Sequence, residues 1–187
     1  MRLLNGRAVA AAWQQEIRTR VADLQKQAIT PGIGVILVGD EPASLLYTKM
    51  KERVSQSLGL SSKTIHLPAT APTEMVLSAI HQFNTDRSID GFFVQLPLPS
   101  TIDHAAVVEA IAVAKDIDGL HPASLGRLII GDPSRLPATP KGILRLLEAE
   151  NISTQGKHVV IVGRSPILGK PLAAVFVNQA ATVTVCH

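Results

Sequence analysis

The chain has 187 residues, of which 46% are hydrophobic and only 3% aromatic, so its core must consist mainly of Ala, Val, Ile and Leu. Its formal net charge is +3 and its basic residues are scattered, so we expect no nucleic-acid partner. No apolar run reaches the ~18 residues that span a bilayer, and the single cysteine, Cys186, cannot form an internal disulfide. We therefore expect a cytoplasmic protein with no membrane partner.

Three segments open the chain. Apolar residues recur at helical spacing in residues 8–28, which predicts an amphipathic helix. Residues 34–40 (GVILVGD) form a short apolar run rich in β-branched residues, which predicts a buried parallel strand. A second helix is expected from about residue 40 to residue 58, with Pro42 in its first turn. Its apolar stripe is expected to pack on the sheet and consists of Leu46, Met50, Val54 and Leu58.

The same alternation continues through the next fifty residues. Strands are expected at residues 63–67 and 91–97, and helices at residues 73–84 and 103–114. Alternating strands and helices are typical of a parallel sheet covered by helices, so we predict a three-layer α/β/α domain over residues 1–120. Ligands of such sheets bind at the carboxyl ends of the strands.

A second domain is expected over residues 121–187. Residues 116–137 are rich in turn-forming residues and are interpreted as a linker region. Residues 139–150 then predict a helix, residues 157–163 a buried strand, and residues 181–187 a last strand. The order favours a Rossmann-type domain, which is incomplete in this chain because only one strand–helix–strand unit is present.

The strand at residues 157–163 leads into a glycine turn that could bind a dinucleotide. An apolar strand runs into Gly163 and a helix begins near Gly169, so backbone N–H groups and the helix N-terminus would face a pyrophosphate. The spacing is not the usual G-x-G-x-x-G, and a simple tight turn explains it as well. Arg164 and Ser165 offer a guanidinium and a hydroxyl to phosphate. The last strand ends in Cys186 without the carboxylate typical of NAD sites, which favours NADP.

Tyr47 and Lys51 are spaced to share one face of the second helix. They follow the first strand, where ligands of a parallel sheet bind. A lysine partly desolvated there would have a lowered pKa and could exchange a proton near neutral pH. The alternative is a surface lysine whose aliphatic part covers the tyrosine ring.

Polar residues also follow the third predicted strand. Gln95 lies at the end of an otherwise apolar run, and a buried amide requires specific hydrogen-bond partners. A purely structural cap is the alternative. Asp116 and Asp118 flank Ile117 close to Gly119, where they are either ligand-binding carboxylates or turn formers.

Five segments, taken together, point to one family. They are GDEPASLLYTKMK, GFFVQLPLP, KDIDGLHP, PATPKGI and VVIVGRSPILGKP, in this order. The chain resembles the methylenetetrahydrofolate dehydrogenase/cyclohydrolase family over nearly its whole length. It departs from the family pattern at Ala138, where many members have Cys, and at Ser124, where Asn is usual. The family's later segments are missing, so the resemblance is to a C-terminally truncated member.

The resemblance implies roles for individual residues. Lys51 would be the general acid/base of the cyclohydrolase step, and Gln95 would hydrogen-bond it and tune its protonation state. Tyr47 would stack on the aminobenzoyl ring of the folate, and Asp118 would hold the pterin ring. Val94 and Leu96, which flank Gln95, are added to the substrate-binding set. Gly163, Arg164 and Ser165 would bind NADP, with Arg164 at the 2′-phosphate, and no metal is expected.

The implied function is NADP-dependent oxidation of 5,10-methylenetetrahydrofolate to the methenyl compound and its hydrolysis to 10-formyltetrahydrofolate, within one-carbon metabolism and purine biosynthesis. The family resemblance also implies a homodimer. One alternative is a short paralogue or fragment that binds folate or a partner without dehydrogenase turnover. Another is an enzyme like the shikimate or amino-acid dehydrogenases, against which the VQLPLP and KDIDG segments argue.

Overall fold

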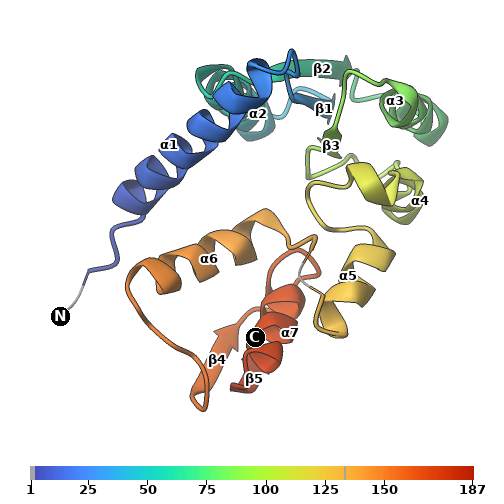
Figure 1. The fold of residues 1–187 in the computed structure, drawn as a ribbon. Helices are drawn as coiled ribbons and strands as arrows, with labels where there is room; N and C mark the ends of the chain where they lie inside the picture. The colour runs from blue at the N-terminus through green and yellow to red at the C-terminus, as the bar shows by residue number, and fades with distance from the viewer. Residues whose placement is uncertain (1–2, 133) are drawn as a thin grey trace. The chain divides into compact units, whose positions relative to one another are not determined.

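The computed structural model describes residues 3–132 and 134–187, which divide into two compact units. One unit is Trp13–Ile117. The other is Asp118–His187 together with the N-terminal segment that ends at Ala12. Figure 1 labels the helices and strands, and each unit is described by itself.

The unit Trp13–Ile117 is built on a three-stranded sheet. Its strands are β1 (Gly32–Val38), β2 (Ser61–Leu67) and β3 (Gly91–Val94), in the order β2-β1-β3. Both pairings are parallel, and Val35 of β1 lies opposite Thr64 of β2 and Phe93 of β3. The predicted parallel sheet is therefore confirmed. Strand β3 is shorter than expected, since it ends at Val94.

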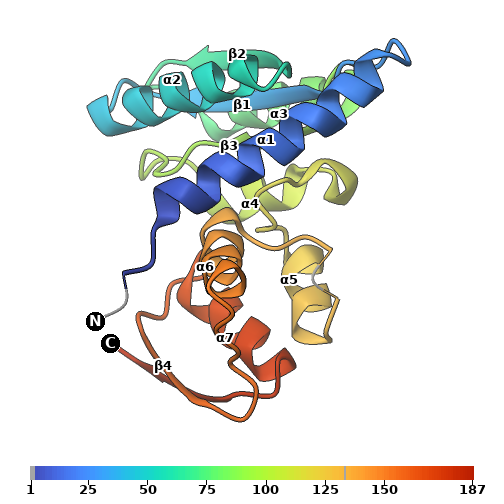
Figure 2. The same ribbon diagram turned by 60° about the vertical axis from the view of Figure 1, so that its left-hand side comes forward.

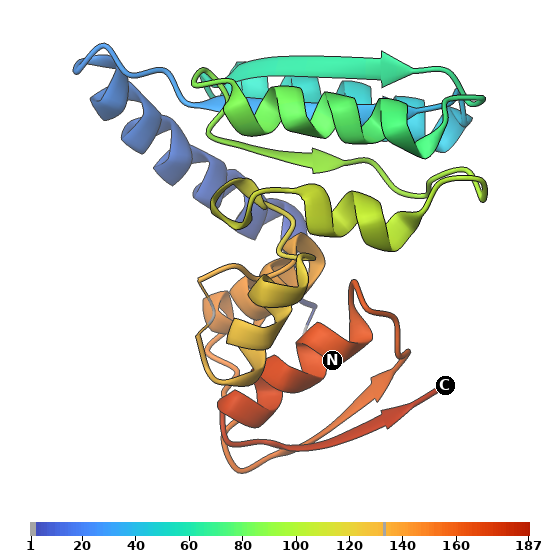
Figure 3. The same cartoon turned by 90° about the vertical axis from the view of Figure 1, so that its right-hand side faces the viewer.

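Helices cover both faces of this sheet. The chain forms α1 (Gly6–Gln25), α2 (Pro42–Ser57), α3 (Thr73–Thr85), α4 (His104–Ala110) and the short η1 (Val113–Lys115). Helix α2 runs alongside β1 and β2 (Figure 2), and α3 lies on the other side of the sheet (Figure 3). On the α3 side Phe83 and Phe92 meet edge to face, with ring centroids 5.4 Å apart, inside the main apolar core. The three-layer prediction is confirmed.

The predicted inward face of α2 is wrong. Leu46, Met50 and Val54 are 68%, 51% and 37% exposed, and only Leu58, just after the helix, is buried. The buried residues of the helix itself are small and polar: Ser44, Thr48 and Ser55. Small side chains on the inner side of α2 allow the helix to pack close to the sheet, and the longer apolar side chains lie on its outer side. Hydrophobic periodicity therefore predicts the wrong face of this helix as the buried one.

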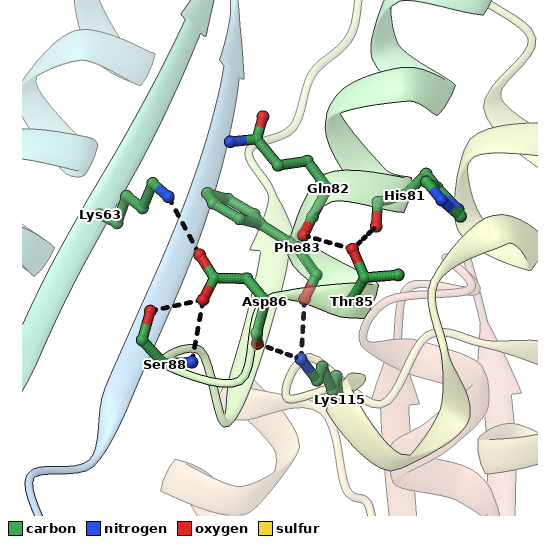
Figure 4. Close-up of polar contacts among 8 residues, drawn as sticks. All are labelled: Lys63, His81, Gln82, Phe83, Thr85, Asp86, Ser88 and Lys115. Atoms are coloured by element: carbon green, nitrogen blue, oxygen red, sulfur yellow. Dashed lines mark hydrogen bonds and ion pairs between the residues drawn. The ribbon is translucent and has the colours of Figure 1, made fainter.

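A polar cluster fixes the end of α3 and the loop that leads to β3 (Figure 4). Asp86 accepts hydrogen bonds from the hydroxyl and amide of Ser88 at 2.6 and 2.9 Å and from Lys63 of β2 at 3.0 Å. These contacts, the Ser88 bonds foremost, hold the pKa of Asp86 well below its usual range. Lys115 donates to the carbonyl oxygens of Phe83 and Asp86 at 2.8 and 2.7 Å, which satisfies two acceptors at the C-terminus of α3. The cluster thus secures the position of β3.

The unit that begins at Asp118 contains a parallel β4-β5 pair. Its elements are α5 (Pro122–Ile129), α6 (Ala138–Ala149), β4 (His158–Val162), α7 (Gly169–Asn178) and β5 (Thr182–Cys186). Helix α7 packs on both strands, as Figure 3 shows, which confirms the predicted strand–helix–strand unit. The linker predicted at residues 116–137 is wrong, because Pro122 opens a helix there whose residue Leu128 is buried. Among the described residues, no helix combines the length and hydropathy that crossing a membrane requires.

Candidate functional site

Lys51 and Gln95 form the center of the candidate site. Lys51 lies on α2, and its Nζ donates a hydrogen bond of 3.0 Å to Oε1 of Gln95. Gln95 follows β3, and its backbone N–H bonds to the carbonyl of Ile36 at 2.8 Å, which extends the β1–β3 ladder by one residue. Its Nε2 donates to the carbonyl of Leu96 at 2.6 Å. Because the amide nitrogen of Gln95 donates to the carbonyl of Leu96, the amide oxygen of Gln95 faces Lys51.

The aromatic residues around Lys51 come from two elements. Phe93 is only 6% exposed, and the Nζ of Lys51 lies 3.8 Å from the center of its ring. Successive side chains of a strand point to opposite faces, so Phe93 and Gln95 face α2 together. Tyr47 lies one helical turn before Lys51 and is 53% exposed, so its ring is available to a planar ligand. Phe93 is the site residue that sequence reasoning missed, although strand alternation with Gln95 was a usable signal.

The remaining predicted substrate-binding residues lie in different settings. Val94 is buried in the core with α3 and α4, on the face of β3 opposite to Phe93. Leu96 supplies the carbonyl that orients Gln95. Asp118 belongs to the other compact unit, at the start of its longer segment, and is half-buried. Its neighbor Asp116 is almost fully buried, and the backbone of Asp116 forms an isolated bridge with Phe92.

The glycine turn between β4 and α7 requires glycine at two positions. Gly163 has a φ of +131°, a backbone conformation that other residues rarely adopt. A Cβ added to Gly169, the first residue of α7, would collide with the carbonyl group of Gly163, whose carbon would lie only 2.6 Å away. The helix therefore begins in close contact with the end of the strand. This is the construction that lets a dinucleotide pyrophosphate approach a helix N-terminus.

Arg164 and Ser165 follow Gly163 in this turn, and both are exposed. The carbonyl of Ser165 accepts the N–H of Lys170 at 3.1 Å, which folds the loop back onto the start of α7. Gly163 donates to the carbonyl of Cys186 at 2.7 Å, so the turn and the end of β5 are joined. Cys186, which ends β5, and the residue after it, His187, carry no carboxylate side chain. The exposed guanidinium of Arg164 can form charge-assisted hydrogen bonds to a phosphate group.

The fold and the two sites define a class of protein: an α/β protein with a lysine–amide pair at one parallel sheet and a nucleotide-type glycine turn at another. The sequence profile for the tetrahydrofolate dehydrogenase/cyclohydrolase catalytic domain matches residues 4–118. The profile for the NAD(P)-binding domain of the same family matches residues 137–187. The chain belongs to the tetrahydrofolate dehydrogenase/cyclohydrolase family.

Individual relatives agree with this assignment. The chain is 46% identical over 185 residues to the bifunctional protein FolD of Halalkalibacterium halodurans, covering 99% of this chain and 66% of that protein. A crystal structure of the Campylobacter jejuni enzyme FolD, a methylenetetrahydrofolate dehydrogenase/cyclohydrolase, superposes with a TM-score of 0.98 at 40% identity, covering 100% of this chain and 67% of that one. The Trypanosoma brucei enzyme, described in complex with NADP and inhibitor, gives a TM-score of 0.94 at 34% identity, covering 98% of this chain and 63% of that one. The chain thus spans about two thirds of the length of these relatives.

Proposed function

We propose that the protein oxidises 5,10-methylenetetrahydrofolate with NADP and then hydrolyses the methenyl product to 10-formyltetrahydrofolate. The observation that carries the proposal is the Lys51–Gln95 pair, which places a half-buried amine at the carboxyl end of a parallel sheet. Support comes from the two family profiles and from relatives described as bifunctional. The activity belongs to one-carbon metabolism, and its formyl product is a donor suited to purine biosynthesis.

In the proposed hydrolysis Lys51 moves the proton. Water adds to the methenyl carbon and gives one proton to the neutral amine of Lys51. The bond between that carbon and N5 then breaks, N5 keeps the electron pair, and Lys51 returns its proton to N5. The hydroxyl proton leaves to solvent as the formyl group forms, so one proton is released in total. Gln95 accepts a hydrogen bond from the ammonium, which lowers the cost of charging Lys51 beside a cationic substrate.

The folate-binding roles rest on the family resemblance together with local geometry. The exposed ring of Tyr47 is proposed to stack on the aminobenzoyl group. Leu96 is proposed to contact the substrate beside Gln95. The side chain of Val94 belongs to the core, so any contribution it makes comes through its backbone. The role of Asp118 in holding the pterin ring, and residues 1–120 as the folate-binding domain, stay predictions.

The local geometry of the glycine turn between β4 and α7 supports NADP as its ligand. Gly169 lets the start of α7 lie against the carbonyl group of Gly163, and Arg164 and Ser165 are exposed in the same turn. We assign the 2′-phosphate to Arg164 and the pyrophosphate to the backbone of Gly163 and Ser165, within a cofactor-binding domain over residues 121–187. NADP held by Gly163, Arg164 and Ser165 would supply the hydride acceptor for the oxidation.

Two further expectations concern assembly and location. We propose a homodimer on the basis of the family resemblance alone. We also propose that the protein works in the cytoplasm, where its free, exposed Cys186 would stay reduced.

Two assays on the 187-residue chain test the proposal. Hydrolysis is followed as loss of the methenyltetrahydrofolate absorbance, and oxidation as NADPH absorbance formed from methylenetetrahydrofolate. Activity in both assays supports the full proposal. Hydrolysis without NADPH formation overturns the oxidation step for this chain. If the folded chain shows neither activity but binds 5-formyltetrahydrofolate, the proposal is wrong for this chain. The protein would then bind folate without turnover.

A further inference from the structure

The ammonium of Lys51 lies over the face of an aromatic ring as well as beside Gln95. Its Nζ is 3.8 Å from the center of the Phe93 ring, well inside the ~6 Å range of a cation–π contact. The contact is partly desolvated, because Phe93 is almost fully buried and Lys51 is half-buried. Desolvation strengthens such contacts. The Phe93 ring therefore does not only fill space beneath α2; it also interacts with the charged end of Lys51.

The strand geometry makes this placement specific. Phe93 and Gln95 are two residues apart, so both side chains leave the same face of the strand and point toward α2. The Nζ of Lys51 therefore contacts the face of the Phe93 ring and the amide oxygen of Gln95 at the same time. We propose that Phe93 is a positioning residue, whose ring holds the Lys51 ammonium against Gln95. The proposal deepens the proposed hydrolytic function and rests on it for its consequence in catalysis.

Other charged groups near this face are already engaged. Strands β1 and β3 contain no titratable side chain. On β2, Lys63 binds Asp86, and His66 contacts the carbonyl of Gly39 at 2.9 Å and the carboxylate of Asp40 at 3.3 Å. Beside Lys51 on α2, Glu52 accepts a hydrogen bond from Thr64 of β2. From the sheet side, the ring of Phe93 and the amide oxygen of Gln95 both contact the Nζ of Lys51.

A leucine at position 93 would keep most of the apolar volume and lose the charge distribution of the ring. This difference allows the positioning role to be separated from simple packing. A more discriminating series replaces Phe93 by 4-fluoro-, 3,4-difluoro- and 3,4,5-trifluorophenylalanine. Each added fluorine draws electrons from the ring face while the shape changes little.

The first experiment measures the placement without any need for activity. In NMR spectra of lysine-labelled protein, the Hε protons of Lys51 should be shifted upfield by the ring current, with the signal assigned by its loss in Lys51→Met. In Phe93→Leu this signal should return to the position of an ordinary lysine, while the other lysine signals stay in place. An unshifted Lys51 signal in the wild-type protein, or one unchanged in Phe93→Leu, overturns the proposal.

The second experiment measures the consequence for the reaction. Along the fluorinated series, kcat for methenyltetrahydrofolate hydrolysis should fall stepwise, by roughly 2- to 30-fold in total, with KM nearly constant. Equal kcat values across the series would overturn the positioning role. If the wild-type protein shows the shifted signal but no hydrolysis, the failure lies with the proposed function, and the shifted signal still supports the placement of Lys51 by the ring.

Discussion

Lys51 and Gln95, 44 positions apart in the chain, are joined by a hydrogen bond of 3.0 Å between Nζ and Oε1. The bond links the middle of α2 to the residue that extends β3 along β1. Because the amide nitrogen is bound to the carbonyl of Leu96, Gln95 presents only its oxygen to the lysine. The pair is therefore set in one orientation by the backbone around it.

Replacing Gln95 by leucine should weaken hydrolysis by about ten- to hundredfold, because a hydrogen bond to a charged group contributes roughly 1.5–3 kcal/mol. The carbonyl of Leu96 also loses its donor, so the folded state should be checked by circular dichroism. Steady-state hydrolysis of methenyltetrahydrofolate measures the effect. Gln56→Leu, at an exposed position of α2, is the matched control and should keep wild-type activity. Equal activity of both variants would remove Gln95 from the mechanism.

Replacing Gly169 by alanine should destabilise the protein by roughly 1–3 kcal/mol, the usual cost of overpacking, because the added methyl group meets the carbonyl of Gly163. It should also weaken NADP binding, since the helix start must move away from the turn. Chemical unfolding and calorimetric titration with NADP measure the two effects. In Gly142→Ala the new methyl group meets nothing within 4 Å, so that variant should be stabilised by up to about 1 kcal/mol. A Gly169→Ala protein as stable as the wild type would contradict the close contact.

The contribution of Asp86 to stability should depend on pH. The Ser88 hydroxyl and amide and the Lys63 ammonium hold the pKa of Asp86 below its ordinary value of 3.8, so the folded protein favours the ionised carboxylate (Figure 4). A lowered folded-state pKa gives stability that is present above pH 3.8 and is lost as the pH falls toward the folded-state value.

Urea unfolding of the wild type and of Asp86→Asn, measured from pH 7 down to the acid limit of the folded state, checks this dependence. The stability difference should be largest near neutral pH and shrink below about pH 4. Asp23→Asn, on the exposed surface of α1, controls for the change in net charge. A difference between wild type and Asp86→Asn that is constant with pH would refute the role assigned to the carboxylate.

Much of the fold follows from local patterns in the sequence. The runs GVILV and HVVIV are rich in β-branched residues and form the strands β1 and β4, as expected; the prediction that the second strand is buried is wrong, because only Ile161 of β4 is buried while Val160 and Val162 are exposed. Gly163 and Gly169 mark a turn that requires glycine, because Gly163 has a positive φ and a Cβ at Gly169 would collide with Gly163. The spacing of Tyr47 and Lys51 places them one turn apart on α2. Patterns of this kind depend on neighbors in the sequence and are therefore readable without a structure.

Other features depend on contacts between distant segments. Helix α2 turns Ser44 and Thr48 toward the sheet and leaves Leu46 exposed, which reverses the expectation from hydrophobicity. Helix α5 forms in a segment whose turn-forming residues suggested a linker, because its own Leu128 packs against Ala174 and Val175 of α7. The ring of Phe93 under Lys51 requires the packing of α2 on the sheet, and single-segment periodicity contains no information on that packing.

The most direct test of the account is methenyltetrahydrofolate hydrolysis by Lys51→Met compared with Lys49→Met, which removes an exposed lysine from the same helix. Both variants lose one positive charge, so the net charge of the protein changes equally. The account predicts that Lys49→Met keeps wild-type hydrolysis, while Lys51→Met is folded and loses it. Wild-type hydrolysis by a folded Lys51→Met protein would contradict the assignment of Lys51 as the acid/base of the site.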